Sequence, residues 1–175
     1  MRRAARQSLP SGLAAALMVV GCHTTLEPVR LNRPACSDVE ILGKKYAICE
    51  APLSQVDAEL DCELRGAHLA ALESAEENAA VAEAVFAVVK SSNVWLGGSR
   101  DDEFAWSWPS GAVFWRGGRD GAAEGKAFAL WQAGEPNNTS SQTGGAEACL
   151  ALTAEHADWN DRSCELALPY VCELD

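Results

Sequence analysis

The feature that most constrains the fold of this 175-residue chain is its set of seven cysteines. One of them, Cys22, directly follows a segment with the composition of an export signal, which leaves six for pairing. Exported chains usually join an even number of cysteines as disulfides, but six allow fifteen connectivities and spacing alone does not choose among them. Because no two are spaced as Cys-x-x-Cys, the pattern disfavours a metal–thiolate cluster. The six are Cys36, Cys49, Cys62, Cys149, Cys164 and Cys172.

Residues 1–21 have the pattern of a lipoprotein signal peptide. Three arginines precede an apolar run of about eight residues, which is too short for the roughly 20 helical residues that cross a bilayer. The run ends in Val-Val-Gly-Cys, which resembles a bacterial lipobox, so we expect cleavage before Cys22 and lipid on its thiol. An ordinary signal peptide with a chance cysteine is the alternative.

We expect residues 22–35 to be a tether and residues 36–175 to be one domain. The tether carries two prolines and no apolar period. Its His23 is not the aspartate linked to inner-membrane retention, which favours an exported lipoprotein of the outer membrane or cell surface that contacts the membrane through its lipid only. The remaining residues, about 140, suffice to bury roughly two-thirds of the unfolded surface.

The charge balance of the exported chain is strongly acidic. Without the signal's three arginines, 11 Lys and Arg stand against 25 Asp and Glu, a net charge of about −14. Such a surface argues against nucleic acid as a partner and favours solubility or cation binding.

Two helices are expected in the first half of the domain. Leu53 to Gly66 has Ser54 as a candidate N-cap and Gly66 as a stop signal. His68 follows and is expected to be buried with a partner. A second helix should run from Ser74 or Ala75 to Val89. The expected inward faces are Val56, Leu60 and Leu64 in the first helix, and Ala79, Ala82, Val85, Phe86 and Val89 in the second.

The second half has the texture of short strands and turns. Strands are expected at residues 94–98, 104–111, 150–152 and 170–172. The segment Arg116–Lys126 is rich in glycine and charge, and we expect a surface excursion to which no chemistry is assigned. The tryptophans could form an exposed platform for sugars, but the scarcity of other large residues favours a core role. They are Trp95, Trp106, Trp108, Trp131 and Trp159.

Oxygen-bearing side chains are grouped between residues 135 and 161. Three carboxylates and two amides suit a hard cation such as Ca²⁺, which takes roughly six to eight oxygen ligands. The set holds no histidine or thiol, which disfavours Zn²⁺ and copper. A cis bond before Pro136, about 0.5–1 kcal/mol above trans, would turn its neighbours' side chains toward one point. A solvated acidic loop is the alternative. The candidate ligands are Glu135, Asn137, Glu147, Asn160 and Asp161.

Several motifs occur in a specific order along the domain. They are Trp-Leu-Gly-Gly at 95–98, Trp-Ser-Trp-Pro-Ser-Gly at 106–111, Glu-Pro-Asn at 135–137, a Glu two residues before Cys149, and Trp-Asn-Asp at 159–161. Together they resemble the long form of the C-type lectin-like domain, over nearly all of Cys36 to Cys172.

The resemblance implies an α+β fold with two helices, small antiparallel sheets and a long loop region that carries a calcium site. It implies three disulfides, Cys36–Cys49, Cys62–Cys172 and Cys149–Cys164. It also implies that the five candidate ligands coordinate one Ca²⁺, and that a glycan of the mannose, glucose, N-acetylglucosamine or fucose class is bound by Glu135, Asn137, Glu147 and Asn160.

The chain departs from the family pattern in two loops. The loop between Asn137 and Glu147 is longer than in compact mannose-type members, and the Arg116–Lys126 excursion is additional. A second calcium ion is not expected, since the family's auxiliary acidic positions hold Asn138 and Ala148. The acidic run at residues 101–103 is the one candidate for it.

Three functions compete. The leading prediction is calcium-dependent carbohydrate binding without catalysis. The second is a protein-binding adhesin module on the same fold, with structural or vestigial calcium. The third is an enzyme, because Glu147 and Glu155 could imitate a glycosidase pair, but no nucleophile constellation accompanies them, and we expect no enzymatic activity.

Overall fold

A computed structural model describes residues 33–89, 93–139 and 146–174. The predicted signal peptide, Cys22 and most of the predicted tether lie outside these residues. No helix in the described part is long and apolar enough to cross a membrane. The helices are α1 (Gln55–Glu63) and α2 (Ala75–Val89), and the strands are β1 (Cys36–Ile41), β2 (Lys44–Leu53), β3 (Ala67–Leu69), β4 (Asn93–Arg100), β5 (Ala105–Ser107), β6 (Val113–Arg116), β7 (Ala122–Ala123), β8 (Cys149–Thr153), β9 (Asp158–Arg162) and β10 (Leu168–Leu174).

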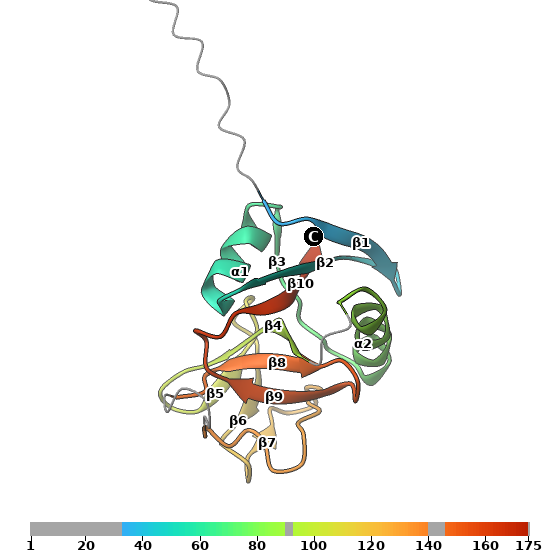
Figure 1. Cartoon of the computed structure of the whole chain (residues 1–175). Helices are drawn as coiled ribbons and strands as arrows, with labels where there is room; N and C mark the ends of the chain where they lie inside the picture. Colours follow the sequence, from blue (N-terminus) through green and yellow to red (C-terminus); the bar gives the residue numbers. More distant parts are fainter. Residues whose placement is uncertain (1–32, 90–92, 140–145, 175) are drawn as a thin grey trace, which may run out of the picture. The chain divides into compact units, whose positions relative to one another are not determined.

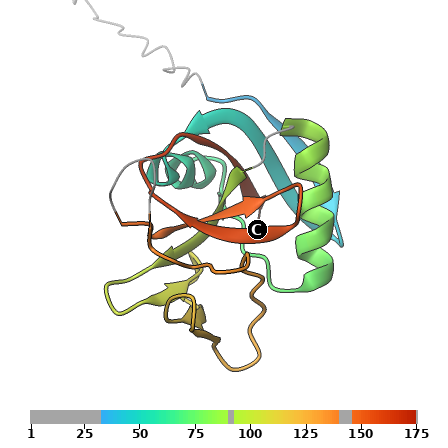
Figure 2. The same ribbon diagram turned by 60° about the horizontal axis from the view of Figure 1, so that its bottom comes forward.

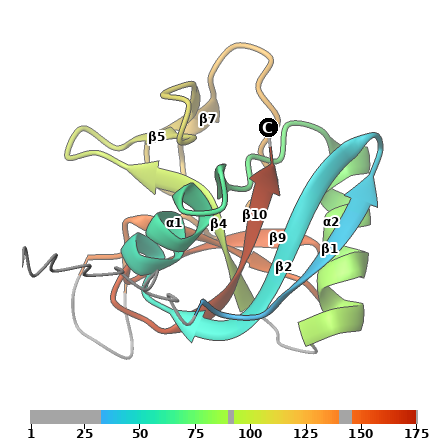
Figure 3. The ribbon, with the colours of Figure 1, turned by 90° about the horizontal axis from the view of Figure 1, so that it is seen from above.

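The strands form one continuous hydrogen-bonded network in the order β1-β2-β10-β4-β5-β6-β7, with β3 on β10 and the β8–β9 hairpin on β4. The pairing of β10 with β4, at Tyr170 and Trp95, is parallel, and it joins the terminal strands to the centre of the domain. Helices α1 and α2 lie on opposite sides of β2 and β10 (Figures 1 and 3). The opposite end, with β5, β6, β7 and the following loop, comes forward in Figure 2.

The three disulfides that the resemblance implied are all present. Cys36–Cys49 joins β1 to β2, Cys62–Cys172 joins α1 to β10, and Cys149–Cys164 joins the start of β8 to the segment after β9. The second bridge spans 110 residues of sequence and so holds the two ends of the domain together.

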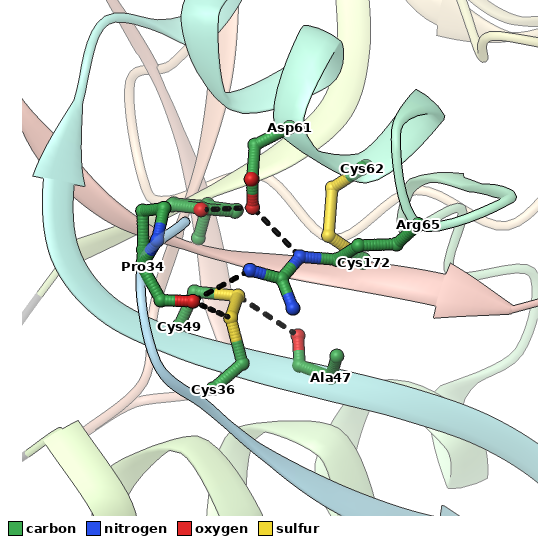
Figure 4. Close-up of polar contacts among 9 residues, drawn as sticks. Pro34, Cys36, Ala47, Cys49, Asp61, Cys62, Arg65 and Cys172 are labelled. Carbon is green, nitrogen blue, oxygen red and sulfur yellow. Dashed lines mark hydrogen bonds and ion pairs between the residues drawn. A yellow bond between two sulfur atoms is a disulfide. The ribbon is translucent and has the colours of Figure 1, made fainter. Parts of the chain in front are cut away.

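A polar cluster supports the first two disulfides (Figure 4). The Arg65 guanidinium donates to Asp61 Oδ2 at 2.7 Å and to the Pro34 carbonyl at 2.7 Å. Asp61 also accepts the Tyr170 hydroxyl, at 2.5 Å. The start of the domain is therefore tied to both α1 and β10.

The tryptophans belong to the core, as predicted. Trp95, Trp106 and Trp159 are fully buried and Trp108 is 5% exposed, while Trp131 is partly buried against them. Two indole N–H groups have acceptors, the Leu53 carbonyl for Trp95 and the buried Asn78 side chain for Trp159. An exposed stacking platform built from these rings is excluded.

The predicted position of α1 is confirmed, but its predicted inward face is wrong. Ser54 caps the helix by accepting from the Asp57 N–H at 3.2 Å, and Gly66 follows it with φ +74°. However, Val56, Leu60 and Leu64 are 68%, 53% and 46% exposed. The buried face consists of Gln55, Ala58, Asp61 and Cys62. The disulfide at Cys62 and the hydrogen bonds of Asp61 fix the rotation of this helix, and they override its apolar periodicity.

The predicted inward face of α2 is confirmed only in part. Ala82 and Val85 are buried as expected, Val89 is only partly buried, and Ala79 and Phe86 are exposed. Polar residues replace them, because Glu77 accepts the Tyr46 hydroxyl at 2.6 Å and Asn78 accepts the Trp159 indole N–H at 2.8 Å. The predicted burial of His68 is likewise wrong, since its exposed ring pairs with Glu59 at 2.7 Å.

Candidate functional site

The β8–β9 hairpin is the rigid part of the candidate site. Its register pairs Ala151 with Asn160 and Leu150 with Asp161. Glu147 lies two residues before β8, and the Cys149–Cys164 disulfide closes the base of the hairpin. Three of the five predicted ligands are therefore placed by strand pairing and a covalent bridge.

The remaining two predicted ligands lie in a loop that runs beside β9. The Gln132 N–H donates to the Trp159 carbonyl at 2.8 Å, and the Trp159 N–H donates to the Leu130 carbonyl at 2.8 Å. The loop then turns, with the Glu135 N–H on the Gln132 carbonyl at 2.9 Å. The Glu135–Pro136 peptide bond is cis, as the sequence suggested.

Asp161 anchors this loop. Its carboxylate is fully buried and accepts the N–H of Asn137 at 3.1 Å and the N–H of Asn138 at 2.7 Å. One acidic side chain on a strand thus aligns the backbone on either side of the Asn137 side chain.

The surroundings of Glu135 and Glu147 raise the pKa of both carboxyl groups. Burial, and then the neighbouring Asp161 carboxylate, raise the pKa of Glu135, although hydrogen bonds from Asn137 partly oppose the rise. Burial raises the pKa of Glu147 to about 7, with Asp161 and Glu135 adding to the effect and Arg162 opposing it. Like-charged carboxylates near one another in a partly dry site favour either a proton or a bound cation.

The donor set fits a hard cation. Glu135 Oε2 is buried, and no hydrogen bond reaches it from the part of the chain that the structure describes. A buried carboxylate oxygen without a partner is costly, and a cation would satisfy it. The oxygens of Glu135, Glu147 and Asp161 together with the Asn137 amide are the chemistry that Ca²⁺ prefers.

Asn160 bonds a residue outside the set of candidate ligands through its side chain. It is 9% exposed, and its amide donates to Gln132 Oε1 at 3.2 Å. In the described ranges, no hydrogen bond joins its side chain to the other predicted ligands. The structure thus brings together Glu135, Asn137 and Asp161. Glu147 lies close enough to Asp161 and Glu135 for their carboxylates to raise its pKa.

The three carboxylates are not as tightly gathered as a closed metal site requires. Among the described residues, the groups whose ligand atoms all lie within 4.8 Å of one another are elsewhere. One contains Cys36 and Cys49, whose sulfurs are already joined as a disulfide. The other consists of Glu59, Glu63 and His68, on α1 and β3.

Arg100 also supports the loop, a role that no sequence motif indicated. Its guanidinium donates to Asn138 Oδ1 at 2.7 Å, to the Glu147 carbonyl at 3.2 Å and to the Asp101 carbonyl at 3.3 Å. Asn138 Oδ1 also accepts the Glu147 N–H at 3.0 Å. Arg100 therefore links the segments that carry Asn137 and Glu147.

The acidic run at residues 101–103 has a structural role where the structure describes it. Asp101 Oδ1 accepts the N–H of Glu103 at 2.9 Å and of Ala105 at 2.8 Å, which closes the turn between β4 and β5. Asp102 and Glu103 are exposed. Asp101 is thus used within the turn, and the absence of a second ion stays a prediction.

Comparison with known proteins places these observations in a family. The model of the lectin C-type domain matches residues 51–174. Lectin subunit alpha of Sarcophaga peregrina is 33% identical over an alignment of 143 residues, and the alignment covers 75% of this chain and 44% of that protein. The chain thus spans less than half the length of that relative.

Solved structures agree with the family match. The mouse scavenger receptor C-type lectin carbohydrate-recognition domain aligns with a TM-score of 0.63 and 26% identity, over 79% of this chain and 95% of that one. A calcium-independent type II antifreeze protein aligns with a TM-score of 0.56 and 23% identity, over 78% of this chain and 95% of that one. The latter likeness concerns the fold alone, and it shows that this fold exists without calcium dependence.

Proposed function

The chain belongs to the C-type lectin domain family, which confirms the predicted fold, and on this premise we propose that it is a calcium-dependent carbohydrate-binding module. The family and its fold serve binding and not catalysis, and we assign the chain to that class. The bound sugar would belong to the mannose, glucose, N-acetylglucosamine or fucose class, because the Glu-Pro-Asn motif at 135–137 resembles that of members with this preference.

The observation that carries the proposal is the burial of Glu135 and Glu147 beside the Asp161 carboxylate. Glu135 has a buried oxygen without a partner in the described chain, and the pKa of both Glu135 and Glu147 is raised. A divalent cation would neutralise this charge and coordinate the Glu135 oxygen that has no hydrogen-bond partner among the described residues. The ion would be held by Glu135, Asn137, Glu147, Asn160 and Asp161.

The same side chains would select the sugar. When bound, Ca²⁺ supplies open coordination positions for two neighbouring hydroxyl oxygens of a sugar. Glu135 and Glu147 can accept the protons of those hydroxyls, while the amides of Asn137 and Asn160 can donate to their oxygens. This division into acceptors and donors would orient the ring and would set the preference among sugars.

We further propose that the module is displayed on the cell envelope as a lipoprotein anchored at Cys22. The support is the sequence pattern of residues 1–22 described above. A shallow single site gives weak binding to one sugar, so many anchored copies on a surface would supply avidity.

The test is calorimetric titration of the compact unit, residues 32–175, with Ca²⁺ and then with methyl α-mannoside. We expect binding of about one ion, followed by sugar binding that EDTA abolishes. Glu135→Gln should weaken both steps, whereas Glu155→Gln, an exposed glutamate in the β8–β9 turn, should change neither. Sugar binding of equal strength in EDTA would refute the proposal.

The second candidate is a protein-binding module in which calcium is vestigial. Two observations favour it. The ligand atoms of Glu135, Glu147 and Asp161 do not all lie within 4.8 Å of one another, unlike those of the two groups named above. In addition, the fold occurs in a calcium-independent protein. Absence of calcium heat in the titration above, together with capture of a protein partner that neither EDTA nor free mannose prevents, would favour this candidate over the lectin.

A further inference from the structure

A hollow of about 270 Å³ lies directly beside the candidate calcium ligands. It is bounded by the end of β4, the β6–β7 connection and the loop that carries Asn137. Asn137 and Asp161, two of the five candidate ligands, line the hollow, so it adjoins the candidate calcium site. Its charged lining consists of Arg100, Arg119 and Asp161.

Arg100 contributes a positive charge that the described residues leave uncompensated. Its three acceptors are the Asn138 amide oxygen and the carbonyls of Glu147 and Asp101, all of which are neutral. The guanidinium also lies over the Phe104 ring, at 4.3 Å from the ring centre. These contacts fix its position without cancelling its charge, which is the state of a preorganised anion receptor.

Arg119 supplies the second positive charge, from the excursion at residues 116–126. It is exposed, and no hydrogen bond or ion pair joins it to another part of the chain that the structure describes. Backbone geometry brings this excursion close to the site, because a Cβ on Gly118 would lie 3.4 Å from the Pro136 carbonyl. The Asp161 carboxylate in the same lining already accepts two backbone N–H groups and is a proposed calcium ligand.

We propose that this hollow binds the anionic group of an acidic glycan, whose adjoining residue occupies the calcium site. The inference rests on the proposed lectin function and names its substrate class: an oligosaccharide with a hexuronic acid or a phosphorylated sugar. Two guanidinium groups match a carboxylate or phosphate, which are planar or multidentate acceptors. The Phe104 ring adds an apolar surface for a face of the sugar.

The charge of the whole chain makes such a subsite selective. A net charge of about −14 on the exported chain repels acidic glycans in general. Two arginines at one edge of the calcium site provide a local exception, so an acidic glycan binds in one orientation and is rejected elsewhere on the surface.

The test compares a matched pair of ligands on the same protein. The first is a mannose disaccharide whose second residue is a hexuronic acid, and the second is the same disaccharide with the carboxylate reduced to an alcohol. Calorimetry with Ca²⁺ should show the acid bound about tenfold more tightly, as expected for one charge-assisted contact. A 6-phosphorylated disaccharide in a third arm distinguishes carboxylate from phosphate as the preferred anion.

Arg119→Gln should remove the preference for the acid while leaving the affinity for methyl α-mannoside unchanged. Lys126→Gln removes the same charge from the same excursion outside the hollow, and it should keep the preference. Equal affinities for acid and alcohol in the unaltered protein, or a preference that survives Arg119→Gln, would overturn the inference.

The same measurements distinguish failure of the lectin function from failure of the anion subsite. If neither disaccharide nor methyl α-mannoside binds with calcium, both the lectin function and the anion subsite are refuted. If the acid alone binds, in EDTA as well, and Arg119→Gln abolishes that binding, the anion subsite stands and only its calcium partner is rejected.

Discussion

Protons should compete with calcium at this site in the physiological pH range. Burial and the Asp161 carboxylate raise the pKa of Glu147 to about 7, so without an ion about nine in ten molecules carry a proton there at pH 6 and about one in ten at pH 8. Calcium needs the deprotonated carboxylate. Its apparent affinity should therefore be full well above pH 7 and fall about tenfold between pH 8 and pH 6 through Glu147 alone. The raised pKa of Glu135 acts in the same direction.

Calorimetry at pH 6, 7 and 8, in two buffers with different ionisation enthalpies, measures both the affinity and the protons released. Near pH 7 we expect release of about half a proton per calcium from Glu147, and release near zero above pH 9. Glu155→Gln is the control and should show the same profile. A calcium affinity that is constant from pH 6 to pH 8, with no proton release, would show that these carboxylates do not act together as ligands.

The same carboxyl group links pH to the stability of the calcium-free domain. Its folded-state pKa, about 7, lies above the ordinary value of 4.5, so the folded state holds the proton more tightly than the unfolded chain. Stability should therefore fall as pH rises from 4.5 through 7, by up to about 3 kcal/mol. Thermal melts in EDTA from pH 5 to pH 8 measure this loss, and calcium should reverse it. A melting temperature that rises with pH over this interval would contradict the sign.

Three further outcomes test the fold and the loop. Arg100→Ala should weaken calcium binding several-fold, because the linked segments lose charge-assisted hydrogen bonds of about 1.5–3 kcal/mol, as the same titration would show. Replacing Cys62 and Cys172 by serine should lower the free energy of unfolding by about 4–5 kcal/mol in urea, as the chain-entropy model gives for the 110-residue separation. Leu60→Gln should change stability by less than about 0.5 kcal/mol because Leu60 is 53% exposed, whereas the fully buried Leu152→Ala should cost about 2–5 kcal/mol.

The sequence predicted best what several motifs specify together. Residues 95–98 form a buried strand, and Gly97 shows why its residue type is constrained: a Cβ there would lie 2.5 Å from the Leu69 carbonyl and 2.6 Å from Pro109. Spacing alone left fifteen disulfide connectivities open. The ordered motifs resolved them through resemblance, and all three bridges are present.

Apolar periodicity predicted the inward faces of the helices poorly, because polar and covalent contacts decide which face is buried. On α1 the stripe with Val56 and Leu60 is the most hydrophobic, yet Asp61 and Cys62 face the interior because each bonds a residue of β10. On α2, Asn78 is 1% exposed because its amide is shared between an indole and a backbone carbonyl. Such partners are distant in sequence, and a local pattern carries no information about them.

For the same reason, the sequence did not indicate the positively charged residues of the candidate site. Glu135, Asn137 and Asp161 belong to recognisable motifs, whereas Arg100 and Arg119 do not, and they reach the site only through the folding of β4 and the β6–β7 excursion. In the structure, Asp161 holds the loop by its backbone N–H groups, and Arg100 holds it through Asn138 and the Glu147 carbonyl.

The loop is thus ordered from both sides by groups of the protein itself. A bound ion would therefore contribute mainly compensation of charge and not the ordering of backbone. From this it follows that calcium should raise the melting temperature more at pH 8, where the carboxylates repel one another, than at pH 5, where Glu147 is protonated. If the ion instead ordered an otherwise loose loop, its stabilising effect at saturation would be nearly the same at the two pH values.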